Sequence, residues 1–245
     1  MTNIKRRKFF TTMGAISTIA PVAAATISSN VLAANHPLSS ASKTMKNSAE
    51  KKVFDAKNSA IILIDHQTST MNWIYSQDKK VVENNLRMLA RIGAEVNIPL
   101  VITTTMEETV GPTWEGIQQA APKQYSDRIK RGGTLNCFID PVFKKHVKDL
   151  GRENLIICGL TTDICLLHTV ESALQEGHNV IVVADASGST SKLADETSFD
   201  YFRQIGAYVL SANAAVTELF QDFSTPDGQK VMQINLQEVI SKLGK

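Results

Sequence analysis

Short apolar runs alternate with longer segments of helical period along most of this chain, and this alternation restricts the possible folds more than any other feature. The first run, SAIILID at 59–65, is uninterrupted in Ile and Leu, which is typical of a strand covered on both faces. Apolar residues then recur at helical spacing over 81–96, and Pro99 opens the next run, at 99–105. The pattern indicates an α/β protein with a parallel sheet.

The alternation continues to the sixth apolar run. Further strands are expected within 126–131, 154–159, 179–185 and 207–212. Gly151 and Gly177 close two of the intervening helices. Six strand–helix units predict one doubly wound domain over 53–224, a six-stranded parallel sheet with helices on both faces and right-handed crossovers.

The first 33 residues have the layout of a signal peptide. Lys5, Arg6, Arg7 and Lys8 precede a charge-free, Ala-rich stretch that ends in the cleavage tripeptide Val31-Leu32-Ala33. Paired arginines followed by two phenylalanines resemble a twin-arginine signal, so we expect export of the folded protein to the periplasm. An uncleaved anchor or an unstructured tail is the alternative, although Pro21 and the many small residues argue against a stable membrane helix.

Residues 34–52 are polar and small without apolar period, and they are expected to form a linker. The formal net charge is +2, and loss of 1–33 would change it to about −2, because that segment carries four basic residues and no acidic ones. Neither value suggests a nucleic acid or an acidic membrane surface as a partner.

Polar residues follow each expected strand, and the carboxyl ends of parallel strands meet in one crevice. Asp65 follows the first strand, Lys130 and Arg131 end the third, and Cys165 follows the fourth in the segment GLTTDIC. A cation and a helix N-terminus favour a thiolate, and a carboxylate can accept or relay its proton. These residues predict a cysteine nucleophile site without histidine.

Four segments carry a resemblance to a known family: LIDHQ, IKRGGTLNCF, GLTTDIC with its following helix, and DASG. Together they resemble the isochorismatase-like cysteine hydrolases, most closely the YcaC-like branch, over about 53–222. The resemblance implies a six-stranded parallel sheet and a site made of Asp65, Arg131 and Cys165. It also implies a cis peptide bond between Leu160 and Thr161.

The basic residue departs from the family pattern, in which a lysine is usual. Arg131 is preferred over Lys130 because neighbouring strand residues point to opposite faces, but both remain open. An arginine can hold a thiolate or a carboxylate by its charge but cannot shuttle protons. Asp65 is then the obvious acid and base.

Other polar residues near the motif have plainer interpretations. His168, three residues after Cys165, is the rival base, but its offset along the helix favours a buried, hydrogen-bonded role. His66 could line the pocket, and Asp163 is expected to serve the first turn of its helix. Cys137 and Cys158 are expected to pack without a disulfide.

Two classes of function follow from these residues. The first is a cysteine hydrolase of a small amide or related C–N bond, with a Cys165 thiolate as nucleophile and Asp65 as acid and base. The second is a non-catalytic exported family member retained for ligand binding or assembly. No cofactor and no metal are expected, since the 103–112 segment lacks the Asp-x-His spacing of related nicotinamidases. The expected partner is a small-molecule substrate.

The tail at 225–245 is longer than the sixth unit requires. Its apolar residues at 236–243 have the spacing of a short amphipathic helix. Such a stripe covers either the protein's own core or another subunit. We expect a homo-oligomer, a tetramer or an octamer as the YcaC-like resemblance implies, with the tail at an interface; packing on its own subunit is the alternative.

Overall fold

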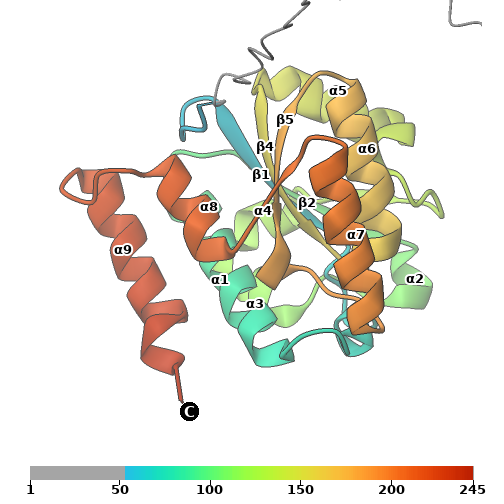
Figure 1. The fold of residues 1–245 in the computed structure, drawn as a ribbon, viewed down its shortest axis with the longest axis horizontal. Coiled ribbons are helices and arrows are strands. Elements are labelled where there is room, and N and C mark those ends of the chain that lie inside the picture. The colour runs from blue at the N-terminus through green and yellow to red at the C-terminus, as the bar shows by residue number, and fades with distance from the viewer. Residues whose placement is uncertain (1–52, 245) are drawn as a thin grey trace, which may run out of the picture. The chain divides into compact units, whose positions relative to one another are not determined.

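The computed structural model of the protein describes residues 53–244, so the expected signal peptide at 1–33 and linker at 34–52 lie outside the described residues. Within 53–244, six parallel strands form one sheet in the order β3-β2-β1-β4-β5-β6 (Figure 1). The strands are β1 (Ser59–Ile64), β2 (Leu100–Thr105), β3 (Ile129–Arg131), β4 (Asn154–Gly159), β5 (Asn179–Val183) and β6 (Tyr208–Leu210). All six were expected from the apolar runs, and the predicted fold class is confirmed.

Helices cover both faces of the described sheet. The α-helices are α1 (Lys79–Glu95), α2 (Glu107–Val110), α3 (Glu115–Ala120), α4 (Pro122–Ser126), α5 (Pro141–Leu150), α6 (Leu167–Gln175), α7 (Lys192–Gln204), α8 (Ala212–Leu219) and α9 (Pro226–Glu238). Short helices of other types are η1 (Thr70–Trp73), η2 (Cys137–Ile139), η3 (Thr162–Leu166), η4 (Ala184–Ala186) and η5 (Ile240–Lys242). No helix in the described part of the chain is long and apolar enough to cross a bilayer.

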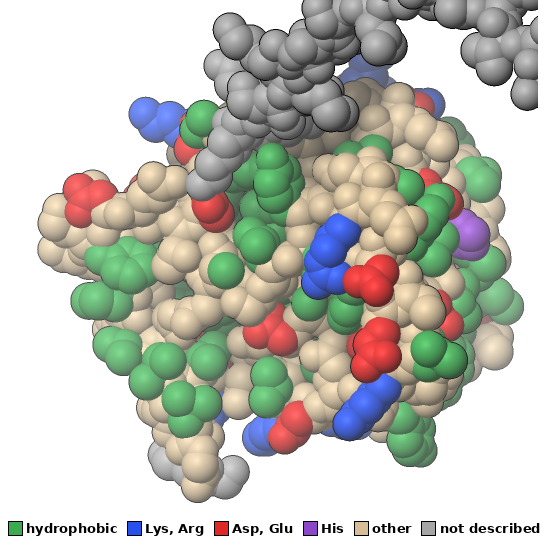
Figure 2. All heavy atoms as spheres, viewed as in Figure 1, with side chains coloured by type: hydrophobic (Ala, Val, Ile, Leu, Met, Phe, Trp, Pro, Cys, Tyr) green, Lys and Arg blue, Asp and Glu red, His purple; other side chains and the backbone are tan. Residues whose placement is uncertain are grey.

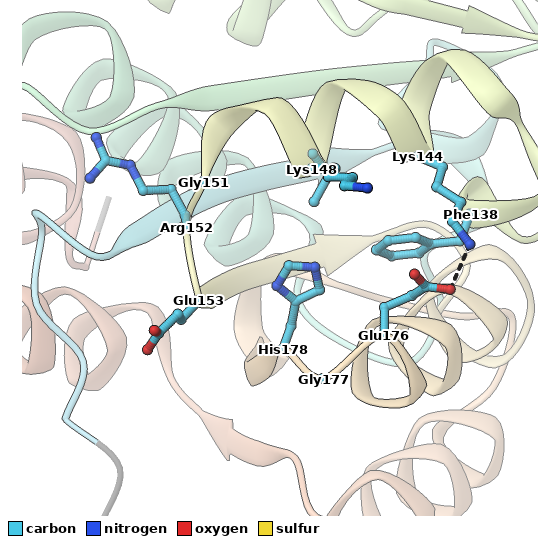
Figure 3. A pocket seen from close by; sticks show the side chains of 10 residues that line it. Phe138, Lys144, Lys148, Gly151, Arg152, Glu153, Glu176, Gly177 and His178 are labelled. Atoms are coloured by element: carbon cyan, nitrogen blue, oxygen red, sulfur yellow. Dashed lines mark hydrogen bonds and ion pairs between the residues drawn. The ribbon is translucent and has the colours of Figure 1, made fainter.

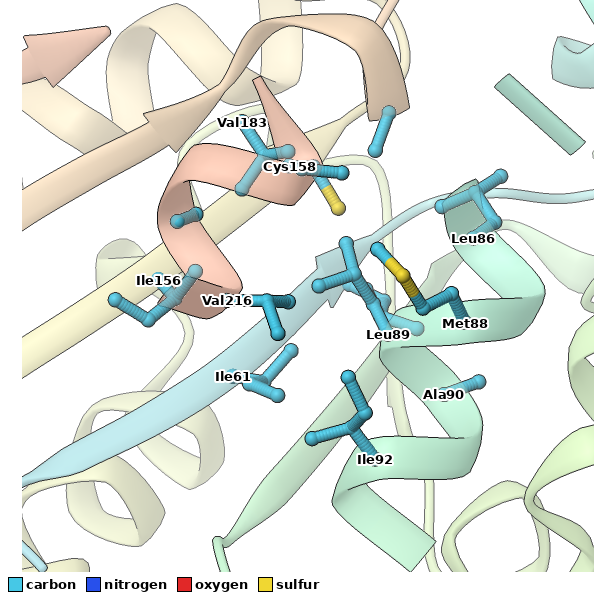
Figure 4. Close-up of a cluster of buried hydrophobic side chains, with 14 of the residues drawn as sticks. Ile61, Leu86, Met88, Leu89, Ala90, Ile92, Ile156, Cys158, Val183 and Val216 are labelled. Atoms are coloured by element: carbon cyan, nitrogen blue, oxygen red, sulfur yellow. The ribbon is translucent and has the colours of Figure 1, made fainter. Parts of the chain in front are cut away.

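The core is divided by the sheet into two apolar layers. In one layer, Ile61 and Ile156 of the strands face Leu89 and Ile92 of α1, with Val216 of α8 closing the group (Figure 4). The other layer packs alternate residues of the same strands against α5, α6 and α7. Both faces of the sheet are therefore buried, which explains why its strands lack polar alternation.

The topological switch point of the sheet lies between β1 and β4. These two strands pair from Ser59 with Asn154 to Ile64 with Gly159. From β1 the chain proceeds to β2 and β3 on one side, and from β4 to β5 and β6 on the other. The loops after β1 and β4 separate at this point and leave room for a site at the carboxyl edge.

The tail helix begins earlier than predicted. Helix α9 starts after Thr225, whose Oγ1 accepts from the Gly228 amide at 3.1 Å, and Pro226 occupies its first turn. Only the short η5 lies wholly within the predicted 236–243 range. The apolar period continued past the helix end, whereas the cap and the proline mark where the helix starts.

Helix α9 has an inner and an outer apolar face. Val231 and Ile234 are buried in the core layer that contains α1. The outer face exposes Met232 and Leu236, and Ile240 of η5 and Leu243 after it are exposed as well. Figure 2 shows apolar side chains along this edge of the molecule. The tail thus covers part of its own core and still presents an apolar surface.

Glu238, at the end of α9, joins the tail to α1. Its carboxylate lies 2.8 Å from Arg87 Nε, 3.0 Å from Arg91 Nη1 and 2.8 Å from Lys242 Nζ. Burial acts to raise the pKa of Glu238, but the hydrogen bonds from these three cations outweigh it and lower the pKa to about 2. The carboxylate therefore stabilises the folded protein at neutral pH.

We expect Glu238→Gln to lower the free energy of unfolding by about 1–3 kcal/mol at pH 7, measured by urea denaturation. The folded pKa lies below the ordinary value, so the stabilisation is present above about pH 4.5 and is lost as the pH falls towards 2. The exposed Glu196 of α7 supplies the control, and Glu196→Gln should change stability by less than about 0.5 kcal/mol. A Glu238→Gln deficit that stays constant between pH 4.5 and 2 would contradict this account.

Candidate active site

Asp65 follows β1 and turns its side chain into the sheet edge. Its backbone is left-handed, with φ +56°, a conformation that Asp tolerates better than most residues. Thr70 Oγ1 donates to the Asp65 carbonyl at 2.6 Å and holds this turn. The carboxylate is fully buried; Oδ1 accepts from Thr103 Oγ1 at 2.8 Å and Oδ2 accepts from Arg131 Nη2.

Arg131, the last residue of β3, is the basic residue that the structure brings to Asp65. Its side chain is fully buried, and Nη1 also donates to the Thr134 carbonyl. Lys130 points the other way, is exposed, and pairs with Glu107 at 3.1 Å. Strand alternation, which was the reason for preferring Arg131, therefore separates the two cations.

Cys165 lies in the turn that follows β4. The peptide bond between Leu160 and Thr161 is cis, as the resemblance implied. The turn is a π-helix, η3, in which the Thr161 carbonyl accepts from the Ile164 and Leu166 amides at 3.2 and 3.3 Å. Cys165 is 6% exposed, and its thiol lies near enough to Asp65 and Arg131 for both charges to shift the pKa of the thiol. The structure thus brings Asp65, Arg131 and Cys165 together.

The protonation of Cys165 differs from the expected thiolate. Burial raises the pKa of the Cys165 thiol, the negative charge of Asp65 raises it further, and Arg131 only partly opposes them. The expectation that the cation and the helix N-terminus favour a resting thiolate is therefore wrong for the free site, because burial of the thiol and the charge of Asp65 outweigh Arg131. The site holds a neutral thiol beside a carboxylate that can take its proton.

Cys137 was expected to pack, and the structure places it beside the same charge pair. It is fully buried, its amide donates to Thr169 Oγ1 at 3.1 Å, and its thiol is near enough to Arg131 and Asp65 for both charges to affect its pKa. Burial raises the pKa of Cys137 to about 12, against the effect of Arg131. Cys137 is thus a neutral neighbour of the site. It, Cys158 and Cys165 are all free thiols.

The two histidines near the motif do not join Asp65 and Cys165. His168 was expected to be buried, but its side chain is 46% exposed and Nδ1 lies 3.2 Å from Glu171 Oε2. The prediction was wrong because the π-turn before α6 changes which positions face inward. His66 is buried, with Nε2 3.0 Å from the Ala186 carbonyl, and burial lowers its pKa to about 4.

Two further observations concern groups around the site. Asp163 lies in the first turn of η3, as expected, and its Oδ1 also accepts from Ser189 Oγ at 3.0 Å, which joins this turn to the loop after β5. Thr103 was not singled out from the sequence, although the run of three threonines inside a buried strand signals a polar contact there. Among residues 53–244, His, Cys, Asp and Glu side chains form no group of three that could hold a metal ion.

A cavity of about 390 Å³ lies between α5 and α6, away from the three site residues (Figure 3). Phe138, Lys148 and His178 face one another across it, and Lys144 pairs with Glu176 at 2.6 Å. None of Asp65, Arg131 and Cys165 lines this cavity. Asp65, Arg131 and Cys165 are thus more enclosed than this cavity, which is open to the helical face of the molecule.

Comparison with known proteins gives consistent matches along the domain. The family model described as the isochorismatase domain matches residues 59–214. The probable hydrolase YcaC of Escherichia coli is 30% identical over 171 residues, which cover 69% of this chain and 81% of that protein. The secreted isochorismatase effector Isc1 of Phytophthora sojae is 26% identical over 145 residues, 57% of this chain and 67% of Isc1.

Two solved structures are similar along most of their length. YcaC from Pseudomonas aeruginosa, described with hexane-2,5-diol and covalent acrylamide, has a TM-score of 0.71 and 27% identity, covering 78% of this chain and 94% of that one. YcaC from Escherichia coli, described as an octameric hydrolase of unknown specificity, has a TM-score of 0.70 and 26% identity, covering 77% and 91%. The described fold and the sequence matches thus agree.

Proposed function

The chain belongs to the isochorismatase family, and from this premise we propose that it is a cysteine hydrolase acting on a small amide or a related C–N bond. One observation carries the proposal: the Cys165 thiol lies beside a buried carboxylate, Asp65, that Arg131 and Thr103 hold in place. A nucleophile, a base and a group that orients the base are the parts that covalent catalysis needs.

In the first half of the reaction, Cys165 passes its proton to Asp65 as the sulfur attacks the carbonyl carbon. The carbonyl oxygen becomes negative, and backbone amides near Thr161 and Cys165 stabilise it. The C–N bond then breaks, Asp65 returns the proton to the leaving nitrogen, and a thioester remains on Cys165. Arg131 stays charged throughout, since a guanidinium does not release its proton.

In the second half, a water molecule gives a proton to Asp65 and its oxygen attacks the thioester carbon. The C–S bond breaks, the acid product leaves, and the sulfur recovers the proton from Asp65. Every proton transfer thus uses one carboxylate. The neutral resting thiol fits this scheme. While the proton is on the sulfur, the Asp65 carboxylate is unprotonated and can accept that proton when attack begins.

The covalent acrylamide described for YcaC from Pseudomonas aeruginosa supports a nucleophile in that relative and suggests the test for this chain. We expect intact-protein mass spectrometry to detect an acyl adduct on wild-type protein with at least one member of a panel of small amides, and no adduct on Cys165→Ala. Because Asp65 takes the proton as the sulfur attacks, iodoacetamide should alkylate Cys165 faster than a free cysteine near neutral pH, although the resting thiol is neutral. Reactivity no greater than that of free cysteine would instead support the non-catalytic alternative.

We also propose a homo-oligomer, a tetramer or an octamer, in which the outer face of α9 lies at an interface. The description of the Escherichia coli relative as octameric and the exposed apolar residues Met232, Leu236, Ile240 and Leu243 support it. Light scattering should give an assembly larger than a monomer, and replacing Met232 and Leu236 by Lys should reduce it. A monomeric wild type, or an unchanged assembly in the variant, would defeat the proposal.

Export to the periplasm remains a proposal that rests on residues 1–33 alone. If Arg6 and Arg7 form a twin-arginine signal, changing both to Lys should leave unprocessed precursor in the cytoplasm. Unchanged accumulation in the periplasm would exclude this route.

A further inference from the structure

The loop after β5 holds the turn that carries Cys165. Three residues of this loop, Ser187, Gly188 and Ser189, each contact the segment that leads to the nucleophile. Ser187 Oγ accepts from the Gly159 amide at 3.2 Å, and the Gly188 carbonyl accepts from the Thr162 amide at 3.0 Å. Ser189 Oγ donates to Asp163 Oδ1 at 3.0 Å. The position of the turn therefore depends on where residues 187–189 lie.

A second loop, at 74–77, holds residues 187–189 from the other side. The Tyr75 and Ser76 amides donate to the Ser189 carbonyl at 2.9 and 3.1 Å, and Ser76 Oγ accepts from the Ser189 amide at 2.9 Å. The two loops approach so closely at Gly188 that a Cβ there would meet Ile74 Cγ2 at 3.0 Å. This close approach explains the glycine of the DASG motif.

The Gln77 side chain joins these loops at one point. Its Nε2 donates to the Ala184 carbonyl at 2.7 Å, to the Ser187 carbonyl at 3.0 Å and to Asp195 Oδ2 at 3.1 Å. Asp195 belongs to α7 and is 4% exposed, and its Oδ1 has no hydrogen-bond partner among the described residues. Because the buried Asp195 carboxylate has few hydrogen bonds, loss of the one from Gln77 should destabilise the folded protein.

We infer that Gln77 is a positioning residue for Cys165, acting through Ser187 and its neighbours on the nucleophile turn. The inference rests on the proposed function, since it concerns the same nucleophile. Gln77 fixes the Ser187 carbonyl, residues 187–189 fix Gly159, Thr162 and Asp163, and these place Cys165 against Asp65. A displacement of about 1 Å at a reacting atom can cost on the order of 100-fold in rate.

The test uses the purified protein and iodoacetamide, whose reaction with Cys165 requires no known substrate. Gln77→Met keeps the length of the side chain but removes its donor, and it should lower the rate constant for Cys165 alkylation on the order of 10- to 100-fold. Ser76→Ala removes only the acceptor for the Ser189 amide, so a smaller loss in the same direction is expected. In the control Gln221→Met, which changes an exposed amide 3.5 Å from the Glu218 carbonyl, the rate should equal that of the wild type.

Hydrogen exchange separates positioning from a general loss of stability. In Gln77→Met the Thr162 amide should exchange faster, while the Leu155 amide inside β4 keeps its protection. If Gln77→Met does not fold, Ser76→Ala decides the matter by the same two measurements.

Two results would overturn the inference. In the first, Cys165 of the wild type is reactive and the folded variants have the same alkylation rate constant, whether or not the Thr162 amide exchanges faster. Gln77 would then have a structural role only. A wild-type Cys165 no more reactive than free cysteine would instead defeat the proposed function, and this inference with it.

Discussion

Asp65→Asn is expected to abolish formation of the acyl adduct on Cys165, with a fall of at least about 10³-fold in rate. Asparagine has nearly the same shape, and its one oxygen can still accept from Arg131 while its amide nitrogen donates to Thr103 Oγ1, but it cannot take the thiol proton. Since the structure favours a neutral thiol at rest, no other described group at the thiol is ready to replace this base. Intact-mass kinetics with the amide that labels the wild type would measure the loss, and circular dichroism would confirm that the variant folds.

The matched control for this prediction is His168→Gln. His168 is exposed and contacts Glu171, so its replacement should leave the rate of adduct formation within about twofold of the wild type. Loss of reaction in a folded His168→Gln protein, or normal reaction in Asp65→Asn, would show that the base is misassigned.

Arg131→Met should produce the largest loss of stability among the substitutions at the site, about 3–5 kcal/mol in the free energy of unfolding. The methionine fills similar space but leaves the fully buried Asp65 carboxylate without its cation and the Thr134 carbonyl without its donor. Urea denaturation at pH 7 measures the change. Arg131→Lys should recover part of it, because an ammonium keeps the charge but cannot reproduce the two-armed contact of the guanidinium.

Lys130→Met is the neighbouring control. Lys130 is exposed, and its contact with Glu107 at 3.1 Å is shared with the stronger pair between Glu107 and Arg128. We expect a change of less than about 1 kcal/mol. Equal losses for Lys130→Met and Arg131→Met would contradict the assignment of Arg131 as the partner of Asp65.

The sheet and the three site residues could be predicted because their causes are local in the sequence. Uninterrupted apolar runs specify strands buried on both faces, and a polar residue directly after such a run must lie at the sheet edge. Strand ends made Asp65 and Cys165 candidates in this way, and the family resemblance then singled them out. The choice between Lys130 and Arg131 followed from alternation along a strand, which the structure bears out in their opposite directions.

The remaining features depend on contacts between distant segments, which periodicity does not encode. The π-turn at η3 rotates the start of the following helix and leaves His168 exposed. The pKa of Cys165 depends first on how deeply the folded chain buries the thiol, and burial together with the Asp65 charge outweighs the cation on which the thiolate expectation rested. Helix α9 was misplaced because its apolar residues face two environments at once.

The contact of Glu238 with Arg87 spans 151 positions of the chain, and this separation has a consequence for protein synthesis. During synthesis α1 leaves the ribosome long before α9. Arg87 and Arg91 of α1 therefore cannot pair with Glu238 while the rest of the sheet is assembled. The ion pairs between Glu238 and α1 can form only after nearly all of the domain has emerged. Chains whose synthesis stops before α9 should therefore be less stable than finished molecules, and proteases should degrade them preferentially.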